Sequence, residues 1–246
     1  MRRRERALGE RDPVMARLIA AAGPCTLEPR LERPPFESLA SAIAHQQLNG
    51  AVAKRILERF TALYAPADFP EPGALAGTSD ATLRATGFSF AKIRALRDLA
   101  DKVQGGVVPT VSELHSLDND AIVERITQVR GIGRWTVEMM LMFQLGRPDI
   151  LPVDDFGVCN GFRLAYGLKG MPRPRALAEF GARWAPHRSL AAWYLWRAVD
   201  LAREKKLPRA GRAPKVTLKE TRAKRAAAKP RKRAPAKKRK PAARRG

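Results

Sequence analysis

Two glycines flank one apolar residue at Gly131-Ile132-Gly133, and this segment constrains the fold more than any other part of the sequence. Because glycine has no Cβ, both positions permit the positive φ of a sharp turn between two helices. An apolar stretch with helical spacing, 135–145, follows directly. Backbone N–H groups at the start of that helix would point outward together and form a site for an anion. The alternative is a plain helix connection without a ligand, since Gly-x-Gly is a weak motif.

Paired carboxylates, Asp154 and Asp155, follow Leu151-Pro152-Val153 and begin another apolar helical stretch that ends at Tyr166. Acidic side chains stabilise the first turn of a helix. In one interpretation, one aspartate caps the helix and the other lies in its first turn. In the other, one carboxylate faces a cleft, where it acts as a base or stabilises developing positive charge.

Apolar residues recur with helical spacing along most of the chain, and no alternation of apolar and polar residues persists. The expected helices cover 13–22, 36–48, 51–64, 80–86, 92–104, 114–129, 135–145, 156–166, 176–184 and 189–203. A loop rich in proline and glycine is expected at 70–77. We therefore expect an all-α fold with two helical lobes, and the hairpin and the aspartate helix at the cleft between them.

Positive charge is concentrated at the C-terminal end. The chain has a net charge of +23, and residues 201–246 contain 20 Lys and Arg against 2 Asp and Glu. We expect three parts: a basic N-terminal extension (1–12), a helical domain (13–206) and a disordered tail rich in Lys, Arg, Ala and Pro (207–246). The tail is interpreted as an arm that holds DNA phosphates. The alternatives are a solubilising tail, or one that binds any polyanion, including RNA.

Cysteine, histidine and apolar content exclude several classes of protein. Cys25 and Cys159 cannot build a disulfide framework and suit a reducing compartment. An iron–sulfur cluster needs four thiolates, and the three histidines have no metal-binding spacing, so we expect no metal and no cofactor. No apolar run approaches the ~20 residues of a membrane helix, and no signal peptide is evident. We expect a cytoplasmic, nucleoid-associated monomer that binds no membrane.

Taken together, the motif Val-Arg-Gly-Ile-Gly-Arg-Trp-Thr (129–136) and the motif Leu-Pro-Val-Asp-Asp (151–155) resemble the helix–hairpin–helix DNA glycosylase superfamily. The similarity is greatest to the bacterial DNA-3-methyladenine glycosylase II group and extends from Asp12 to Arg203, in a compact form without an N-terminal α/β region. The resemblance implies a glycosylase that excises alkylated, cationic purines such as 3-methyladenine from double-stranded DNA by hydrolysing the N-glycosidic bond. It leaves open the preference among 3-methyladenine, 7-methylguanine, 1-methyladenine, ethenoadenine and hypoxanthine.

The resemblance also assigns roles around the two motifs. Asp155 matches the catalytic carboxylate, and the expected base pocket consists of Trp135, Met139, Phe156 and Trp196. Some relatives have an aromatic ring at the position of Met139. The alternative for all four pocket residues is ordinary core packing, because apolar residues on helices mostly belong to the core.

A second set of residues is expected at the DNA: Gln47, Leu48, Gly131, Ile132, Gly133, Arg134 and Thr136. Leu48 follows Gln47 at a helix junction, where the family places an apolar wedge that fills the space left by an extruded nucleotide. The alternative for Leu48 is a core leucine.

The position that carries a Schiff-base lysine in bifunctional relatives is occupied here by Trp135. Arg134 cannot replace that lysine, because a guanidinium stays protonated. The resemblance therefore implies a monofunctional enzyme that leaves the abasic site intact. Two other classes of protein remain open. One is a non-catalytic helix–hairpin–helix DNA-binding module, and the other is an architectural protein whose basic tail carries its activity.

Overall fold

The computed structural model describes residues 2–30 and 33–209, and in this part all regular secondary structure is helical. This confirms the all-α prediction. The elements are α1 (Arg3–Arg11), α2 (Pro13–Ala22), α3 (Pro35–His45), α4 (Gly50–Ala62), α5 (Pro72–Ala76), α6 (Asp80–Ala85), α7 (Phe90–Gln104), α8 (Val111–Ser116), α9 (Asn119–Ile126), α10 (Arg134–Phe143), α11 (Phe156–Ala165), α12 (Pro174–Gly181), the 3₁₀ helix η1 (Ala182–Trp184) and α13 (Arg188–Arg203). None of these helices has the length and apolar character to cross a membrane. The predicted tail lies outside the described residues from 210 onward.

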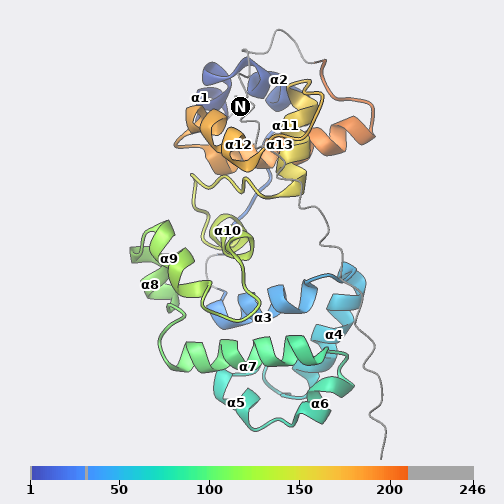
Figure 1. Cartoon of the computed structure of the whole chain (residues 1–246), viewed down its shortest axis with the longest axis vertical. Helices are drawn as coiled ribbons and strands as arrows, with labels where there is room; N and C mark the ends of the chain where they lie inside the picture. The colour runs from blue at the N-terminus through green and yellow to red at the C-terminus, as the bar shows by residue number, and fades with distance from the viewer. Residues whose placement is uncertain (1, 31–32, 210–246) are drawn as a thin grey trace, which may run out of the picture. The chain divides into compact units, whose positions relative to one another are not determined.

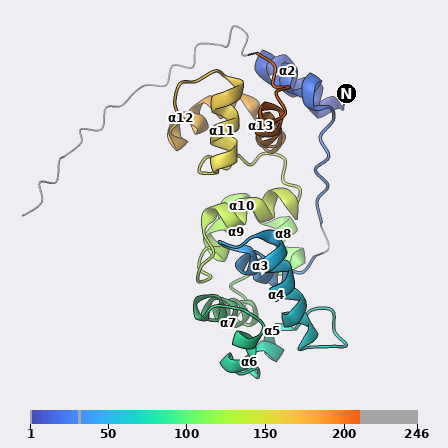
Figure 2. The same cartoon turned by 90° about the vertical axis from the view of Figure 1, so that its right-hand side faces the viewer.

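The helices pack in two groups, which Figures 1 and 2 show on either side of α10. Helices α1, α2, α11, α13 and η1 contact one another, so both ends of the helical region belong to one lobe. Helix α7 packs on α3, α5 and α6 in the second lobe. Contact between α11 and α13 is close because residue 161 is glycine: a Cβ there would overlap the backbone carbonyl of Leu195.

The prediction that residues 1–12 form an extension outside the domain is wrong. Residues 3–11 form α1, which packs on α2 with Leu8 and Glu5 buried. The Glu5 carboxylate accepts hydrogen bonds from the backbone N–H of Cys25 (2.9 Å) and the hydroxyl of Tyr194 (3.1 Å). Most other positions of α1 are arginines, so the sequence did not suggest that two of its positions are buried.

Two further boundaries differ from the expectation. The single helix expected at 114–129 is two helices, α8 and α9, because Leu117 has an extended backbone and the Asp118 carboxylate caps α9 by accepting the N–H of Ala121 (2.7 Å). The segment expected to be a loop at 70–77 contains the short helix α5. At 114–129 the capping residue outweighed the wider apolar pattern, and at 70–77 Pro72 stands in the first turn of the helix, where proline is tolerated.

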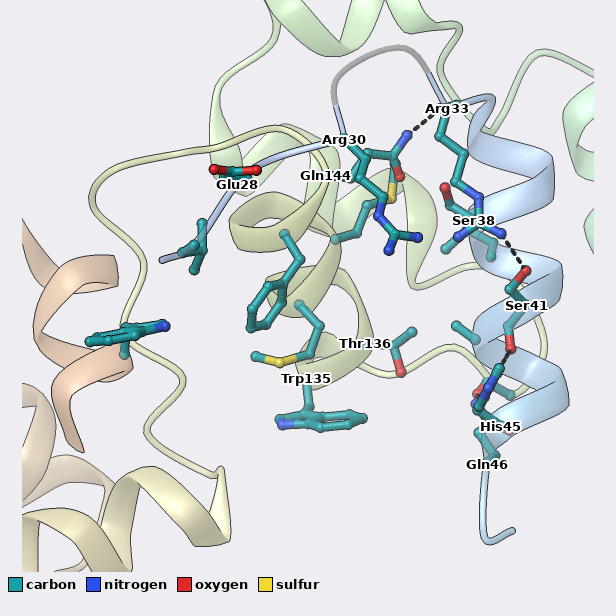
Figure 3. Close-up of a pocket in the computed structure, with 18 of the residues that line it drawn as sticks. Glu28, Arg30, Arg33, Ser38, Ser41, His45, Gln46, Trp135, Thr136 and Gln144 are labelled. Carbon is teal, nitrogen blue, oxygen red and sulfur yellow. Dashed lines mark hydrogen bonds between the residues drawn. The ribbon is translucent and has the colours of Figure 1, made fainter. Parts of the chain in front are cut away.

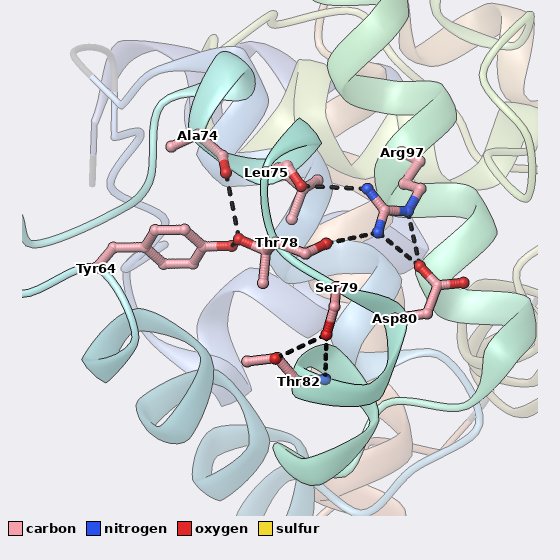
Figure 4. A network of polar contacts seen from close by, with 8 residues as sticks. All are labelled: Tyr64, Ala74, Leu75, Thr78, Ser79, Asp80, Thr82 and Arg97. Atoms are coloured by element: carbon pink, nitrogen blue, oxygen red, sulfur yellow. Dashed lines mark hydrogen bonds and ion pairs between the residues drawn. The ribbon is translucent and has the colours of Figure 1, made fainter.

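A single guanidinium fastens the connection between α5 and α6 to α7 (Figure 4). Arg97, on α7, donates to the carboxylate of Asp80 (2.6 and 2.9 Å) and to the backbone carbonyls of Leu75 (3.2 Å) and Thr78 (2.7 Å). Charge-assisted hydrogen bonds of this kind are stronger than neutral ones. They fix α5 and α6 to α7, and α7 in turn packs on α3.

Candidate active site

The hairpin before α10 adopts the expected turn, but its two glycines serve different purposes. Gly131 has φ of +79°, which favours glycine, and Ile132 is buried beneath the turn. Gly133 has an extended backbone, so the expectation of positive φ at both glycines is wrong for this residue. A Cβ at Gly133 would meet no atom within 4 Å, so packing within the protein does not require glycine there. No side chain caps α10, and the N–H of Thr136 donates to the carbonyl of Gly133 (3.0 Å), which leaves the N–H groups of Arg134 and Trp135 available to an anion.

The junction between α3 and α4 lies beside this hairpin. The side-chain amide of Gln46 donates to the backbone carbonyl of Gly131 (2.8 Å) and ties the two segments together. Gln47 has φ of +56°, a left-handed conformation that is uncommon for residues other than glycine. Such strain persists only where surrounding structure enforces it, and it is frequent at functional sites. The next residue, Leu48, has 39% of its surface exposed and is therefore not a core leucine.

Three N–H donors hold the carboxylate of Asp155. Its Oδ1 accepts from the backbone N–H of Val158 (2.7 Å) and from the indole of Trp196 (2.8 Å), and its Oδ2 accepts from the indole of Trp135 (2.8 Å). An ionised carboxylate offers about four acceptor positions, so one on Oδ2 remains for another group. Asp155 is the N-cap of α11, whereas Asp154 is exposed and makes no capping bond. The capping interpretation therefore applies to Asp155, and the cleft interpretation stays a prediction.

Aromatic rings surround this carboxylate. The Trp196 ring stacks on Phe143, with centroids 5.7 Å apart and planes 27° apart. Residue 157 must stay small, because a Cβ there would lie 2.7 Å from Cδ1 of Trp196. Sequence reasoning missed Phe143, although it lies two helical turns after Trp135 on α10. Phe156, by contrast, is 74% exposed at the start of α11.

A cavity of about 1,020 Å³ lies between α3, α10 and residues 26–30 and 33, and we call it the α3–α10 cavity (Figure 3). Among the predicted site residues, it is lined by Gln47, Gly131, Trp135, Thr136 and Met139. Phe156 and Trp196 do not line it, and Asp155 is connected to it through the hydrogen bond from Trp135. The structure therefore brings the hairpin, the α3–α4 junction and one face of α10 together around one space.

A third carboxylate, which the sequence did not indicate, lies near the aspartate pair. Glu138 is buried on α10 and forms an ion pair with Arg134 (3.0 Å), whose guanidinium is also 3.8 Å from Asp120. Burial raises the pKa of the Glu138 carboxyl, Arg134 opposes this, and the charges of Asp154 and Asp155 raise the pKa further. This part of the molecule consequently has an excess of negative charge, which favours a cation.

These features define a class of protein: a helix–hairpin–helix protein in which the uncapped N-terminus of α10 is followed by a carboxylate framed by tryptophans. Residues 40–187 match the HhH-GPD superfamily of base excision DNA repair proteins, and the chain belongs to this family. Arg134 and Trp135 begin α10 within the matched region, and Asp155 begins α11 there.

Named relatives are consistent with this assignment. The chain is 39% identical to DNA-3-methyladenine glycosylase 1 of Schizosaccharomyces pombe over 171 residues, which cover 70% of this chain and 75% of that protein. The solved 3-methyladenine DNA glycosylase of the same organism, in complex with abasic DNA, has a TM-score of 0.72 at 36% identity and covers 82% of this chain and 98% of that one. A DNA-3-methyladenine glycosidase from Bacillus halodurans has a TM-score of 0.76 at 33% identity, with coverage of 83% and 92%.

Proposed function

We propose that this protein is a monofunctional DNA glycosylase that hydrolyses the N-glycosidic bond of alkylated, cationic purines such as 3-methyladenine in double-stranded DNA, the first step of base excision repair. The main observation behind this proposal is the hydrogen bonding of Asp155. Two indole N–H groups and one backbone N–H fix its carboxylate, and one acceptor position on Oδ2 stays open. Family membership and the names of the relatives support the same reaction.

DNA binding begins at the hairpin and the α3–α4 junction. The N–H groups at the start of α10 bind a phosphate, and the bare backbone of Gly133 allows that phosphate to approach closely. The exposed Leu48, presented by the strained Gln47, enters the duplex and fills the space of the extruded nucleotide. Phosphate contacts position the protein without reading sequence, so this step is the same for every lesion.

The extruded base then enters the end of the α3–α10 cavity that Trp135 and Met139 line. An N-alkylated purine is cationic, so it is attracted to an aromatic face and to the excess of carboxylates around Asp155. As the glycosidic bond breaks, positive charge develops on the sugar, and the open acceptor on Oδ2 stabilises it or orients the attacking water. The cationic base is already a good leaving group and needs little protonation.

Cleavage of the DNA strand is not part of the proposed reaction. A lyase would need an amine nucleophile at the sugar, and the position after the hairpin holds Arg134 and Trp135 instead. The proposal also includes a monomeric enzyme in the bacterial cytoplasm, associated with the nucleoid, whose basic tail (207–246) contacts DNA phosphates. The contact of the tail with phosphates is inferred from the concentration of Lys and Arg at the C-terminal end of the sequence.

The direct test incubates the full chain with methylated duplex DNA and identifies the bases released into solution by chromatography. We expect release of 3-methyladenine, with abasic sites left in strands that remain intact until treated with alkali. A protein that binds the duplex but releases no base would be the non-catalytic module. Loss of DNA binding after deletion of the tail, without any base release, would indicate the architectural protein.

A further inference from the structure

A second cavity, of about 390 Å³, lies between the start of α1, the segment 25–29, the chain that follows α10 and the start of α13, and we call it the arginine cavity. Its volume is within the range of about 300–1,000 Å³ that is usual for small-molecule sites. No residue to which we assign a role in base excision or DNA binding lines it. It is therefore a separate space from the proposed glycosylase site.

The segment 25–30 forms a wall between the two cavities. Neighbouring side chains along it line different cavities: Cys25, Leu27 and Pro29 line the arginine cavity, and Thr26, Glu28 and Arg30 line the α3–α10 cavity, which Leu27 also reaches. The backbone of this wall is fixed at both ends, by the bond from the N–H of Cys25 to Glu5 (2.9 Å) and by the bond from the N–H of Arg30 to the carbonyl of Phe143 (3.1 Å). The arginine cavity is thus bounded by anchored chain.

Four arginines line the arginine cavity. Arg2, Arg3 and Arg4 are exposed, so a molecule from the solvent can reach their guanidinium groups. Arg147 is half-buried and donates to two backbone carbonyls at the end of α8 (2.7 and 2.8 Å), which hold it in place without cancelling its charge. None of the four forms an ion pair with a carboxylate of the described residues. Their positive charges are therefore available to a ligand.

Glu5 is the one carboxylate among the described residues that line this cavity, and its oxygens are already occupied. It is 1% exposed, and it accepts hydrogen bonds from the backbone N–H groups of Cys25 (2.9 Å) and Arg2 (2.7 Å) and from the hydroxyl of Tyr194 (3.1 Å). Burial raises the pKa of Glu5, but these bonds outweigh it and lower the pKa overall, so the carboxylate is ionised at neutral pH. Four arginines against one glutamate leave the lining with a net charge of +3.

His187, which also lines the cavity, adds no charge at neutral pH. Burial lowers its pKa, the charges of Arg11 and Arg4 lower it further, and Asp149 opposes them. Asp149 is itself paired with Arg188 (2.7 Å) and does not line the cavity. Because the pKa of His187 is below its ordinary value of 6.5, the ring is neutral at pH 7. The positive charge of this cavity therefore comes from its arginines.

The lining also offers apolar surface. Leu27 and Leu190 are half-buried, so part of each side chain is open to a ligand, and Met142, Pro29 and Pro148 lie with them around the same space. Guanidinium groups bind phosphate through paired N–H donors. A phosphate monoester carries a charge of about −1.5 to −2 at pH 7, which matches the lining better than the single charge of a carboxylate or a phosphodiester. The apolar surface suits a ring attached to that phosphate.

We propose that the arginine cavity binds a small phosphate monoester whose body is a ring system, the chemistry of a mononucleotide. The phosphate lies among the guanidinium groups of Arg2, Arg3 and Arg4, and the ring lies against Leu27 and Leu190. The site does not depend on the proposed glycosylase reaction, because the two sets of residues are different.

Calorimetric titration of the full chain with adenosine monophosphate (AMP) tests the proposal, with inorganic phosphate and adenosine as the two halves of the probe. We expect saturable binding of AMP that is tighter than the binding of either half. Arg3→Gln combined with Arg4→Gln should weaken it at least about tenfold, the effect of losing one hydrogen bond to a charged group. The matched control, Arg6→Gln combined with Arg94→Gln, removes the same charge from two exposed arginines that do not line the cavity, and it should bind AMP like the wild type.

The proposal is overturned if AMP does not bind at millimolar concentration, or if inorganic phosphate or adenosine binds as tightly as AMP. Equal weakening by the two double variants would also overturn it, because only general attraction by positive charge would remain. Binding of undamaged duplex is measured with the same variants, and a loss confined to the Arg3 and Arg4 variant would assign these arginines to DNA and refute the small-molecule site. Base excision is assayed separately: a chain that binds AMP but excises no base refutes only the proposed function, and one that excises without binding AMP refutes only this inference.

Discussion

Replacing Asp155 with asparagine separates the charge of this side chain from its capping role. Asparagine is as good an N-cap as aspartate, so the bond from the N–H of Val158 (2.7 Å) should persist. If the amide oxygen accepts this bond at the position of Oδ1, the amide nitrogen must occupy the position of Oδ2. There it faces the indole N–H of Trp135, which lies 2.8 Å from Oδ2 in the wild type. Two donors then oppose each other.

The magnitudes follow from this geometry. Loss of one hydrogen bond to a charged group should lower the free energy of unfolding by about 1.5–3 kcal/mol, a decrease that leaves most small domains folded. Excision should fall at least a thousandfold, equivalent to about 4 kcal/mol of transition-state stabilisation, because no negative charge remains to oppose the developing cation. Affinity for undamaged duplex should change by less than about threefold, since the phosphate contacts lie at the hairpin.

The assay is single-turnover release of 3-methyladenine with enzyme in excess, accompanied by thermal unfolding and binding to undamaged duplex. The control is Asp154→Asn. Because Asp154 is exposed and does not cap α11, this variant should stay within about 0.5 kcal/mol of the wild type in stability and keep most of its excision rate. Excision by the Asp155 variant within tenfold of the wild type would refute the role of its charge, and a dead Asp154 variant would show the roles to be reversed.

Three other predictions concern the hairpin, Glu138 and the tail. Gly133→Ala should leave the melting temperature unchanged, because its Cβ has open space, yet weaken binding to damaged and undamaged DNA equally; Gly131→Ala should lower the melting temperature because its φ is +79°. Burial raises the pKa of Glu138, so the folded state binds this proton more tightly than the unfolded state, and stability should fall as pH rises above the ordinary value of 4.5. Glu138→Gln should reduce that slope in denaturant unfolding at several pH values, and an unchanged slope would contradict it. Removing residues 210–246 should flatten the dependence of log affinity on log salt by about 0.9 for each phosphate that the protein no longer neutralises, and an unchanged slope would mean that the tail does not bind DNA.

Local signals in the sequence were sufficient for much of the fold. Proline at the start and glycine after the end fixed α2 at 13–22, as predicted, and α13 begins within one residue of its expected position. The break at Asp118 had a signal too, because aspartate is a preferred N-cap, but the apolar spacing across 114–129 outweighed it in the prediction. Helix α1 had only Glu5 and Leu8 to indicate a buried face among arginines.

The lining of the α3–α10 cavity could not be predicted in the same way. Arg30 comes from an irregular segment, Ser38 from α3 and Gln144 from the C-terminal end of α10. No motif or spacing relates these residues, and tertiary packing alone makes them neighbours. In the sequence, Gln144 is a polar residue at the end of an apolar helix, a position where an exposed side chain is expected. Its burial and its unpaired oxygen become visible only in the folded chain.

One residue can satisfy both interpretations of the aspartate pair, because capping and the proposed catalysis need the same property. An N-cap carboxylate must stay fixed while it accepts a backbone N–H, and a carboxylate that stabilises a sugar cation must stay fixed while it keeps one acceptor free. In Asp155, the bonds from Val158 and Trp196 fix Oδ1, and the bond from Trp135 orients Oδ2 without saturating it. Removing either indole N–H should therefore disturb the chemistry more than the fold. Trp135→Phe and Trp196→Phe, which keep an aromatic ring at each position, separate these two contributions in the single-turnover assay.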